Sequence, residues 1–170
     1  MTIYGKESFT KIVTVLRSGG DYQRIHVEKI RGMVERYVSE FEFICLTDSP
    51  TEEYDRPLKH DWPGWWAKME IFNIPGPVLF LDLDTIIVDN IDCIIKSLKD
   101  QPFVTLRDNF GAANRTVQMS GIGSDIGSGI MSWSEDVAYL YHSFLKDSEK
   151  FMSELRGDQD FIQREAKENT

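Results

Sequence analysis

The sequence predicts an α/β protein, a three-layer domain in which helices cover both faces of a mostly parallel sheet. Segments rich in β-branched and aromatic residues alternate with segments whose apolar residues recur every three or four positions. In addition, residues 78–81 form an unbroken apolar run, which is typical of a strand buried on both faces of a sheet. Together these two observations favour strands and helices in alternation around one central sheet.

The first part of the chain has the strand–helix–strand order of a βαβ unit. Residues 11–16 (KIVTVL) predict one strand, and residues 42–47 (EFICLT) predict the next. Between them, residues 23–38 carry apolar side chains at helical spacing, after a glycine-containing turn at 17–22. Residues 51–63 are polar and contain prolines, so they predict a loop.

A short amphipathic helix is predicted at residues 64–72 (GWWAKMEIF), just before the central strand. At α-helical spacing, Trp65, Met69 and Phe72 share its buried face. Lys68 then falls between that face and the solvent.

The chain after the central strand predicts further strands and helices around one long loop. Strands are predicted at 102–106 and 129–133, and the stretch between them, 107–128, is polar and glycine-rich. Loops of that length are often functional. The predicted helices cover 91–98, 134–146 with Ser134 as its cap, 148–156, and the residues from Asp158 onward.

Length and composition suit a single domain over residues 1–170. A net charge of −9 argues against a nucleic-acid surface and against an anionic membrane surface. No stretch approaches the roughly 18 apolar residues of a transmembrane segment, and the N-terminus lacks an apolar signal core. Cys45 and Cys93 both sit among apolar residues, so we expect two buried, reduced thiols in a cytoplasmic protein.

Two aspartates at the end of the central strand are the main functional signal. In an extended chain Asp82 and Asp84 point the same way, about 6 Å apart, and repel by about 3 kcal/mol at an effective dielectric near 20. A cation between them would remove that cost, and paired hard oxygens suit Mg²⁺ or Mn²⁺ shared with substrate phosphates. The alternative is a strand that runs into a turn with both aspartates solvated.

Four segments combine with this pair: RSGGDY at 17–22, GWWAKMEIF at 64–72, LFLDLDT at 79–85, and GSGIMSW at 127–133 with GDQDFI at 157–162. In this order the set resembles the glycosyltransferases of the A-type nucleotide-sugar fold, especially the glycogenin-like family eight and its bacterial relatives. The resemblance covers about residues 11–162. It implies a nucleotide-diphospho-sugar transferase (GT-A, Rossmann-like) fold and transfer of a hexose from a UDP-sugar, with retention, to an unknown glycan, lipid or protein acceptor.

The resemblance also implies roles for individual residues. Asp82 and Asp84 match the Asp-x-Asp that holds Mn²⁺ or Mg²⁺ against the donor diphosphate. Asp158 and Gln159 match the pair beside the transferred sugar and are the candidate catalytic residues. The candidate substrate-binding residues are Leu16, Arg17, Gly20 and Tyr22 for the nucleoside, Lys68 for the donor, and Ser128 and Gly129 for the sugar pocket.

The sequence departs from the family at its C-terminal end. The family carries a further stretch with a His-x-Gly element, whose histidine completes the metal site. His26, His60 and His142 have no glycine two residues later, so the third metal ligand stays open. Water, another side chain or a second subunit in a homo-oligomer could take that position.

Two alternatives from other classes remain. One is a non-catalytic or weakly active nucleotide-sugar-binding module, because the C-terminal element is missing. The other is a haloacid-dehalogenase-type phosphatase, which also has Asp-x-Asp after an apolar strand. That family needs Thr or Val two residues after the second aspartate, where this chain has Ile86, and a late Gly-Asp-x-x-x-Asp, where it has Ile162 in the last position.

Overall fold

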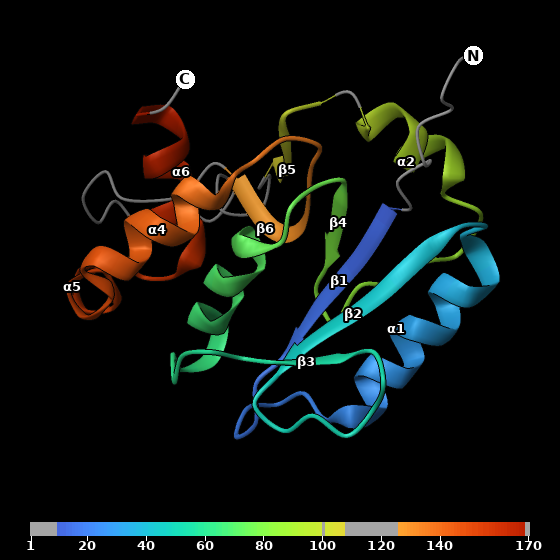
Figure 1. Ribbon diagram of the computed structural model, residues 1–170, viewed down its shortest axis with the longest axis horizontal. Coiled ribbons are helices and arrows are strands. Elements are labelled where there is room, and N and C mark those ends of the chain that lie inside the picture. The colour runs from blue at the N-terminus through green and yellow to red at the C-terminus, as the bar shows by residue number, and fades with distance from the viewer. Residues whose placement is uncertain (1–9, 100, 108–125, 169–170) are drawn as a thin grey trace, which may run out of the picture.

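The computed structural model describes residues 10–99, 101–107 and 126–168, and its described part is built on a six-stranded sheet (Figure 1). The order across the sheet is β3-β2-β1-β4-β6-β5. The strands are β1 (Thr10–Leu16), β2 (Phe41–Thr47), β3 (Asp55–Pro57), β4 (Val78–Leu81), β5 (Phe103–Arg107) and β6 (Ile126–Trp133). The four strands β1 to β4 run parallel, whereas β6 is antiparallel to both β4 and β5.

Helices cover both faces of this sheet. Helices α1 (Arg24–Tyr37) and α2 (Asp92–Leu98) pack on one face. The other face is covered by the 3₁₀ helix η1 (Gly64–Asn73), α4 (Ala138–Lys146), α5 (Ser148–Glu154) and α6 (Asp158–Glu168). The predicted class, α/β in three layers with a mostly parallel sheet, is therefore confirmed.

Strand β1 shows why the sequence takes this architecture. Ile12 packs in the core under α1, and its neighbour Val13 packs in the core under η1; neither is exposed to solvent. Successive side chains of a strand point to opposite faces, so an unbroken apolar run needs cover on both sides. Leu79 and Phe80 of β4 divide between the two cores in the same way.

The helix before the central strand differs from the prediction. Residues 64–73 form a 3₁₀ helix, in which side chains three apart lie over one another. Trp66, Met69 and Phe72 therefore share the buried face. Trp65 is 55% exposed, so its predicted place on the buried face is wrong.

Several element boundaries also differ. Strand β3 lies inside the predicted loop at 51–63, and β6 begins at Ile126, so Ser128 is part of a strand. The rest of the predicted long loop, residues 108–125, lies outside the described residues. Strand β3 and the first residues of β6 form because their backbones pair with neighbouring strands, although their local composition does not favour a strand.

Two further predictions are corrected by contacts. Helix α4 begins at Ala138, whose backbone N–H donates to Oδ1 of Asp136 (2.8 Å), and the predicted cap Ser134 instead donates its hydroxyl to the carbonyl of Gln101 (2.8 Å). Cys45 is buried as expected, but Cys93 is exposed on α2. No helix among the described residues is long and apolar enough to cross a membrane.

A core substitution tests this packing. Replacing Phe80, which is fully buried in β4, by Ala should lower the free energy of unfolding by about 3–5 kcal/mol, because the cavity and the lost transfer energy both contribute. Urea denaturation measures this loss. Ile86→Ala is the control: that side chain is 75% exposed, and its loss should change stability by less than about 0.5 kcal/mol. Equal effects for the two variants would contradict the observed packing.

Candidate functional site

The predicted site residues meet where the strand order reverses. From β1 the chain continues to β2 on one side, whereas from β4 it continues to β5 and β6 on the other, so β1 and β4 lie at a topological switch point. Ligands of open α/β sheets bind beyond the carboxyl ends of the strands at such points. Residues 17–22 follow β1, and Asp82 and Asp84 follow β4, so both segments open onto this crevice.

The centre of the site is an ion-paired group of three side chains. The Nζ of Lys68 lies 2.7 Å from Oδ2 of Asp82 and 3.6 Å from Oδ2 of Asp158. The side chains of Lys68 and Asp158 are 12% and 7% exposed, and that of Asp82 is 28% exposed. The group joins η1, the end of β4 and the start of α6, so residues far apart in the sequence are brought together as expected.

Small residues of β6 form one side of this group. The Ser128 hydroxyl is buried and lies 3.4 Å from Nζ of Lys68. The backbone N–H of Asp82 donates to the carbonyl of Gly129 (2.8 Å), which holds the aspartate against β6. A Cβ at position 129 would lie 3.8 Å from Oδ2 of Asp82, so glycine keeps the space beside that carboxylate open. Ser128 and Gly129 thus lie beside Lys68 and Asp82, and their role in a sugar pocket stays a prediction.

The charges of this group depend on one another. Burial by itself would lower the pKa of Lys68, but the carboxylates of Asp158 and Asp82 outweigh it and the pKa is raised. Burial raises the pKa of Asp82, against the opposing effect of Lys68. Oδ2 of Asp158 is buried and accepts no hydrogen bond from the described residues, since 3.6 Å is an ion-pair distance. Lys68 therefore stays an ammonium ion and is the counter-charge of both aspartates.

Tyr22 connects the turn after β1 to the second aspartate. Its hydroxyl donates to Oδ2 of Asp84 (3.1 Å), and its ring edge meets the His26 ring at a centroid distance of 5.4 Å. Burial and then the negative charge of Asp84 raise the pKa of Tyr22, so the phenol keeps its proton for this bond. The ring is 40% exposed and presents an aromatic surface to the crevice.

Arg17 is held by acidic groups that the sequence reasoning did not single out. Its guanidinium contacts Asp48 (2.8 Å) and Asp61, and Asp48 also accepts hydrogen bonds from the backbone N–H and hydroxyl of Ser18. Burial would raise the pKa of Asp48, but these Ser18 bonds and the Arg17 charge lower it. The signal available in the sequence was position, because Asp48 directly follows β2 at the same edge of the sheet.

Three predicted residues take no side-chain part in these contacts. Leu16 is buried in the core under α1, and its backbone pairs with Thr47 at the end of β1. Gly20 is exposed in the turn after β1. Gln159 is half-buried on the first turn of α6, and no hydrogen bond of the described residues joins it to Lys68.

Comparison with solved structures identifies the fold. Two crystal structures of the glycosyltransferase GlyE from Streptococcus pneumoniae TIGR4 match, one of them in the apo form. Their TM-scores are 0.65 and 0.60, at 15% and 14% sequence identity, over 89% and 91% of this chain. The chain has a glycosyltransferase fold. It spans 42% of the length of these GlyE chains. No protein-family model and no curated protein matches the sequence.

In this glycosyltransferase fold the aspartate pair fits a divalent cation only in part. Asp82 and Asp84 offer the hard carboxylate oxygens that Mg²⁺ and Mn²⁺ prefer. Among the described residues, however, no group of three or more His, Cys, Asp or Glu side chains could hold a metal ion. The donor set thus fits a cation that takes its other ligands from substrate and water, and such a cation would share Asp82 with Lys68.

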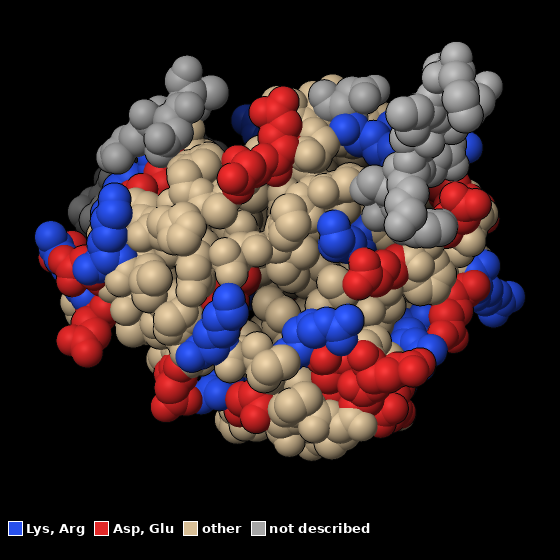
Figure 2. Space-filling view, viewed as in Figure 1, with Lys and Arg blue, Asp and Glu red and all other residues tan. Residues whose placement is uncertain are grey.

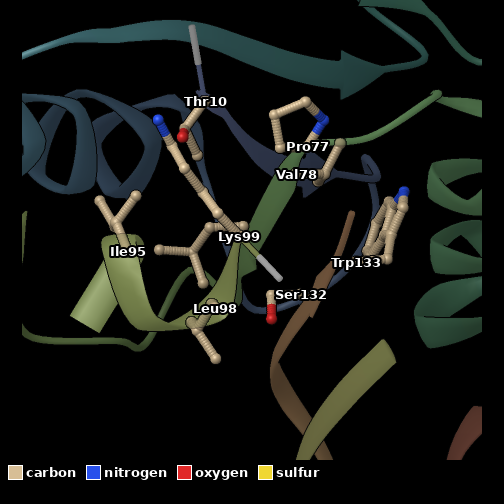
Figure 3. A pocket seen from close by; sticks show the side chains of 9 residues that line it. Thr10, Pro77, Val78, Ile95, Leu98, Lys99, Ser132 and Trp133 are labelled. Atoms are coloured by element: carbon tan, nitrogen blue, oxygen red, sulfur yellow. The ribbon is translucent and has the colours of Figure 1, made fainter. Parts of the chain in front are cut away.

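A small cavity lies away from this site. It is lined by Thr10 and Val78, the first residues of β1 and β4, and by Ser132 and Trp133 of β6 (Figure 3). Asp82 follows the opposite end of β4. The cavity volume is about 10 Å³, on the order of a single water molecule, so it is too small for a sugar.

The ion-paired group predicts a stability effect at position 68. Lys68→Ala should lower the free energy of unfolding by roughly 2–4 kcal/mol at neutral pH, because it leaves Asp82 and Asp158 without a counter-charge. This loss is smaller than for a fully buried pair, because Asp82 is partly exposed to solvent. In the variant the pKa of Asp82, which burial raises, should lie above that of the unfolded chain. The folded state then binds more protons, so the deficit should shrink as the pH falls toward about 5. Urea denaturation at neutral pH and at about pH 5 measures this loss in the free energy of unfolding.

The control for this substitution is Lys29→Ala, an exposed lysine of α1. It should change stability by less than about 0.5 kcal/mol at either pH. A Lys68→Ala variant as stable as this control would show that the ammonium does not compensate the two aspartates.

Proposed function

We propose that this chain is a metal-dependent glycosyltransferase of the family-eight type, which moves a hexose from a UDP-sugar to an acceptor with retention of configuration. The observation that carries the proposal is the Lys68 ammonium between Asp82 and Asp158, at the switch point of a glycosyltransferase fold. This places one cation and two carboxylates together in a crevice that otherwise opens between strand ends.

Breaking the sugar–phosphate bond builds negative charge on the departing diphosphate. Lys68 supports the proposal because a buried ammonium stabilises such charge without having to reorganise. A divalent cation held by Asp82 and Asp84 would supply further positive charge to the same diphosphate when bound. An acidic protein can bind a polyanionic donor in this way, because Lys68 and a divalent cation together would offset the charges of Asp82, Asp84 and Asp158.

The sugar develops positive charge as the same bond breaks. Asp158 supports the proposal here, since its buried carboxylate, paired with Lys68, is a fixed negative charge beside the expected position of the sugar. Gln159, one residue on, would add an amide oxygen or N–H to the transferred sugar. Ser128 and Gly129 would line the pocket with small groups that admit a pyranose ring.

The turn after β1 would hold the nucleoside. Tyr22 offers a half-exposed ring for stacking on uracil, and its bond to Asp84 fixes that ring beside the diphosphate site. Arg17, kept in place by Asp48 and Asp61, would orient the same segment. The backbones of Leu16 and Gly20 would complete the contact with the base and ribose.

A panel of UDP-sugars incubated with the protein and Mn²⁺ tests the proposal. We expect release of UDP from one or two of these donors, dependent on the metal, and transfer once an acceptor is supplied. Proton NMR of the product's anomeric signal then tests retention. Binding of UDP without any turnover across the panel would favour the non-catalytic nucleotide-sugar-binding module.

The metal proposal predicts cooperation between Mn²⁺ and UDP. Together they should raise the melting temperature by more than the sum of their separate effects, because each supplies ligands for the other. Asp84→Asn should abolish this cooperation, while its amide oxygen can still accept the Tyr22 hydrogen bond. Differential scanning fluorimetry measures the shifts.

Asp89→Asn is the matched control, since Asp89 is an exposed aspartate of the same connection. It should retain the cooperation. Full cooperation in Asp84→Asn would mean that the aspartate pair is not the metal site.

A further inference from the structure

One tryptophan at the edge of the site is unlike the other three. Trp65 is 55% exposed, whereas Trp62, Trp66 and Trp133 are between 1% and 6% exposed and belong to the core under η1. The indole N–H of Trp65 donates to no group of the described residues, and Trp65 differs from the other three in its exposure. Single exposed apolar residues are common on protein surfaces, so exposure alone does not give Trp65 a role. A role for Trp65 follows from where it lies relative to the site.

The position of Trp65 follows from the 3₁₀ geometry of η1. The helix begins at Gly64, whose φ of +54° lies in the left-handed region that favours glycine. Side chains three apart in a 3₁₀ helix are eclipsed, with about 6 Å of rise between them. Trp65 therefore lies on the same side of η1 as Lys68, one turn before it.

Gly157, in the loop before α6, lies directly beside the indole of Trp65. A Cβ at Gly157 would lie 3.3 Å from Nε1 of Trp65 and 3.7 Å from its Cδ1. At the shorter of these distances the indole would have to shift by a few tenths of an ångström to admit a larger residue, so Gly157 and the position of the Trp65 ring are linked. Gly157 directly precedes Asp158, whose carboxylate pairs with Lys68. Trp65 thus borders the group of Lys68, Asp82 and Asp158 through two separate segments of the chain.

We propose that Trp65, with Gly157 beside it, is the platform on which the sugar ring of a carbohydrate acceptor stacks. This inference rests on the proposed function and names the class of its acceptor. The C–H groups on one side of a pyranose carry partial positive charge and match the negative face of an indole. The free N–H at the edge of the ring is a donor for a sugar hydroxyl.

The surroundings of Trp65 favour a carbohydrate over a lipid. A lipid chain needs a continuous apolar groove, whereas the indole lies against Gly157, which stands in the chain between the exposed Arg156 and the acidic Asp158. Pockets for polar ligands of this kind combine an aromatic surface with a few charged and hydrogen-bonding groups. A sugar on the platform would present its hydroxyl beside Asp158, where the donor sugar is expected.

NMR of the four indole N–H groups tests the platform without any turnover. The ¹⁵N-labelled protein is titrated with methyl β-D-galactopyranoside, methyl α-D-glucopyranoside and maltose, and Trp65→Phe identifies the Trp65 signal. We expect the Trp65 signal to shift in a saturable way with at least one glycoside, while the three buried indoles stay in place. Galactitol is the control, because it has the hydroxyl groups of a sugar but no ring face.

The outcomes decide between occupants. No shift with any glycoside at tens of millimolar would overturn the proposal. A shift with galactitol equal to that of the glycosides would also overturn it, because stacking would not be involved. A response to short-chain phospholipid micelles in place of the glycosides would assign the surface to a lipid acceptor and overturn the carbohydrate inference.

Substitutions then connect the platform to transfer. With the donor identified by the UDP-sugar panel, Trp65→Ala and Gly157→Ala should each raise the acceptor KM about tenfold, more than they lower kcat, and Trp65→Tyr should restore most of the affinity. Leu145→Ala, an exposed apolar control on α4, should leave the acceptor KM unchanged. An unchanged KM in Trp65→Ala would overturn the platform while the proposed function stands. Glycoside binding at Trp65 without any use of UDP-sugars would overturn the proposed function while the carbohydrate site stands.

Discussion

The ammonium of Lys68 is the interaction on which the site depends. It is the shared partner of Asp82, at the end of β4, and of Asp158, at the start of α6. Buried carboxylates are costly unless a counter-charge is close, so the position of α6 against the sheet and the charge state of the site are set together. The same contact ties η1, whose apolar residues pack in the core, to the end of β4 and the start of α6.

The distribution of charge explains how an acidic chain can present such a site. The net charge is −9, and on the face in Figure 2 basic side chains are dispersed among acidic ones. On that face there is no basic patch of the kind that follows a nucleic-acid backbone. Arg17 and Lys68 are each tied to aspartates within the crevice. The two basic side chains are therefore fixed by aspartates where the two strand ends meet, and each group retains an excess of negative charge.

The geometry of η1 links this electrostatic centre to the surface around it. Three residues per turn place Trp66, Met69 and Phe72 in the core, and they place Trp65 with Lys68. In an α-helix the faces would divide differently, and Trp65 would be buried. The register of one short helix thus decides which aromatic side chain borders the site and which ones stabilise the fold.

The sequence by itself determined the elements whose signals are local. The apolar spacing of Val27, Ile30 and Val34 specified the buried face of α1, and the unbroken run before Asp82 specified a strand covered on both sides. The order of motifs was enough to name the fold class and to single out Lys68, Asp82 and Asp158. These inferences hold because periodicity and strand ends are properties of neighbouring residues.

Only the tertiary structure decided the rest. The early start of β6 and the presence of β3 depend on backbone pairing with strands elsewhere in the chain, which local propensity does not describe. Three other features are likewise contacts across the fold. Arg17 pairs with Asp48 and Asp61. Gly157 lies against the indole of Trp65, and Lys68 is buried between two carboxylates. Their energies depend on distance and desolvation in three dimensions, and neither quantity can be read from the order of residues.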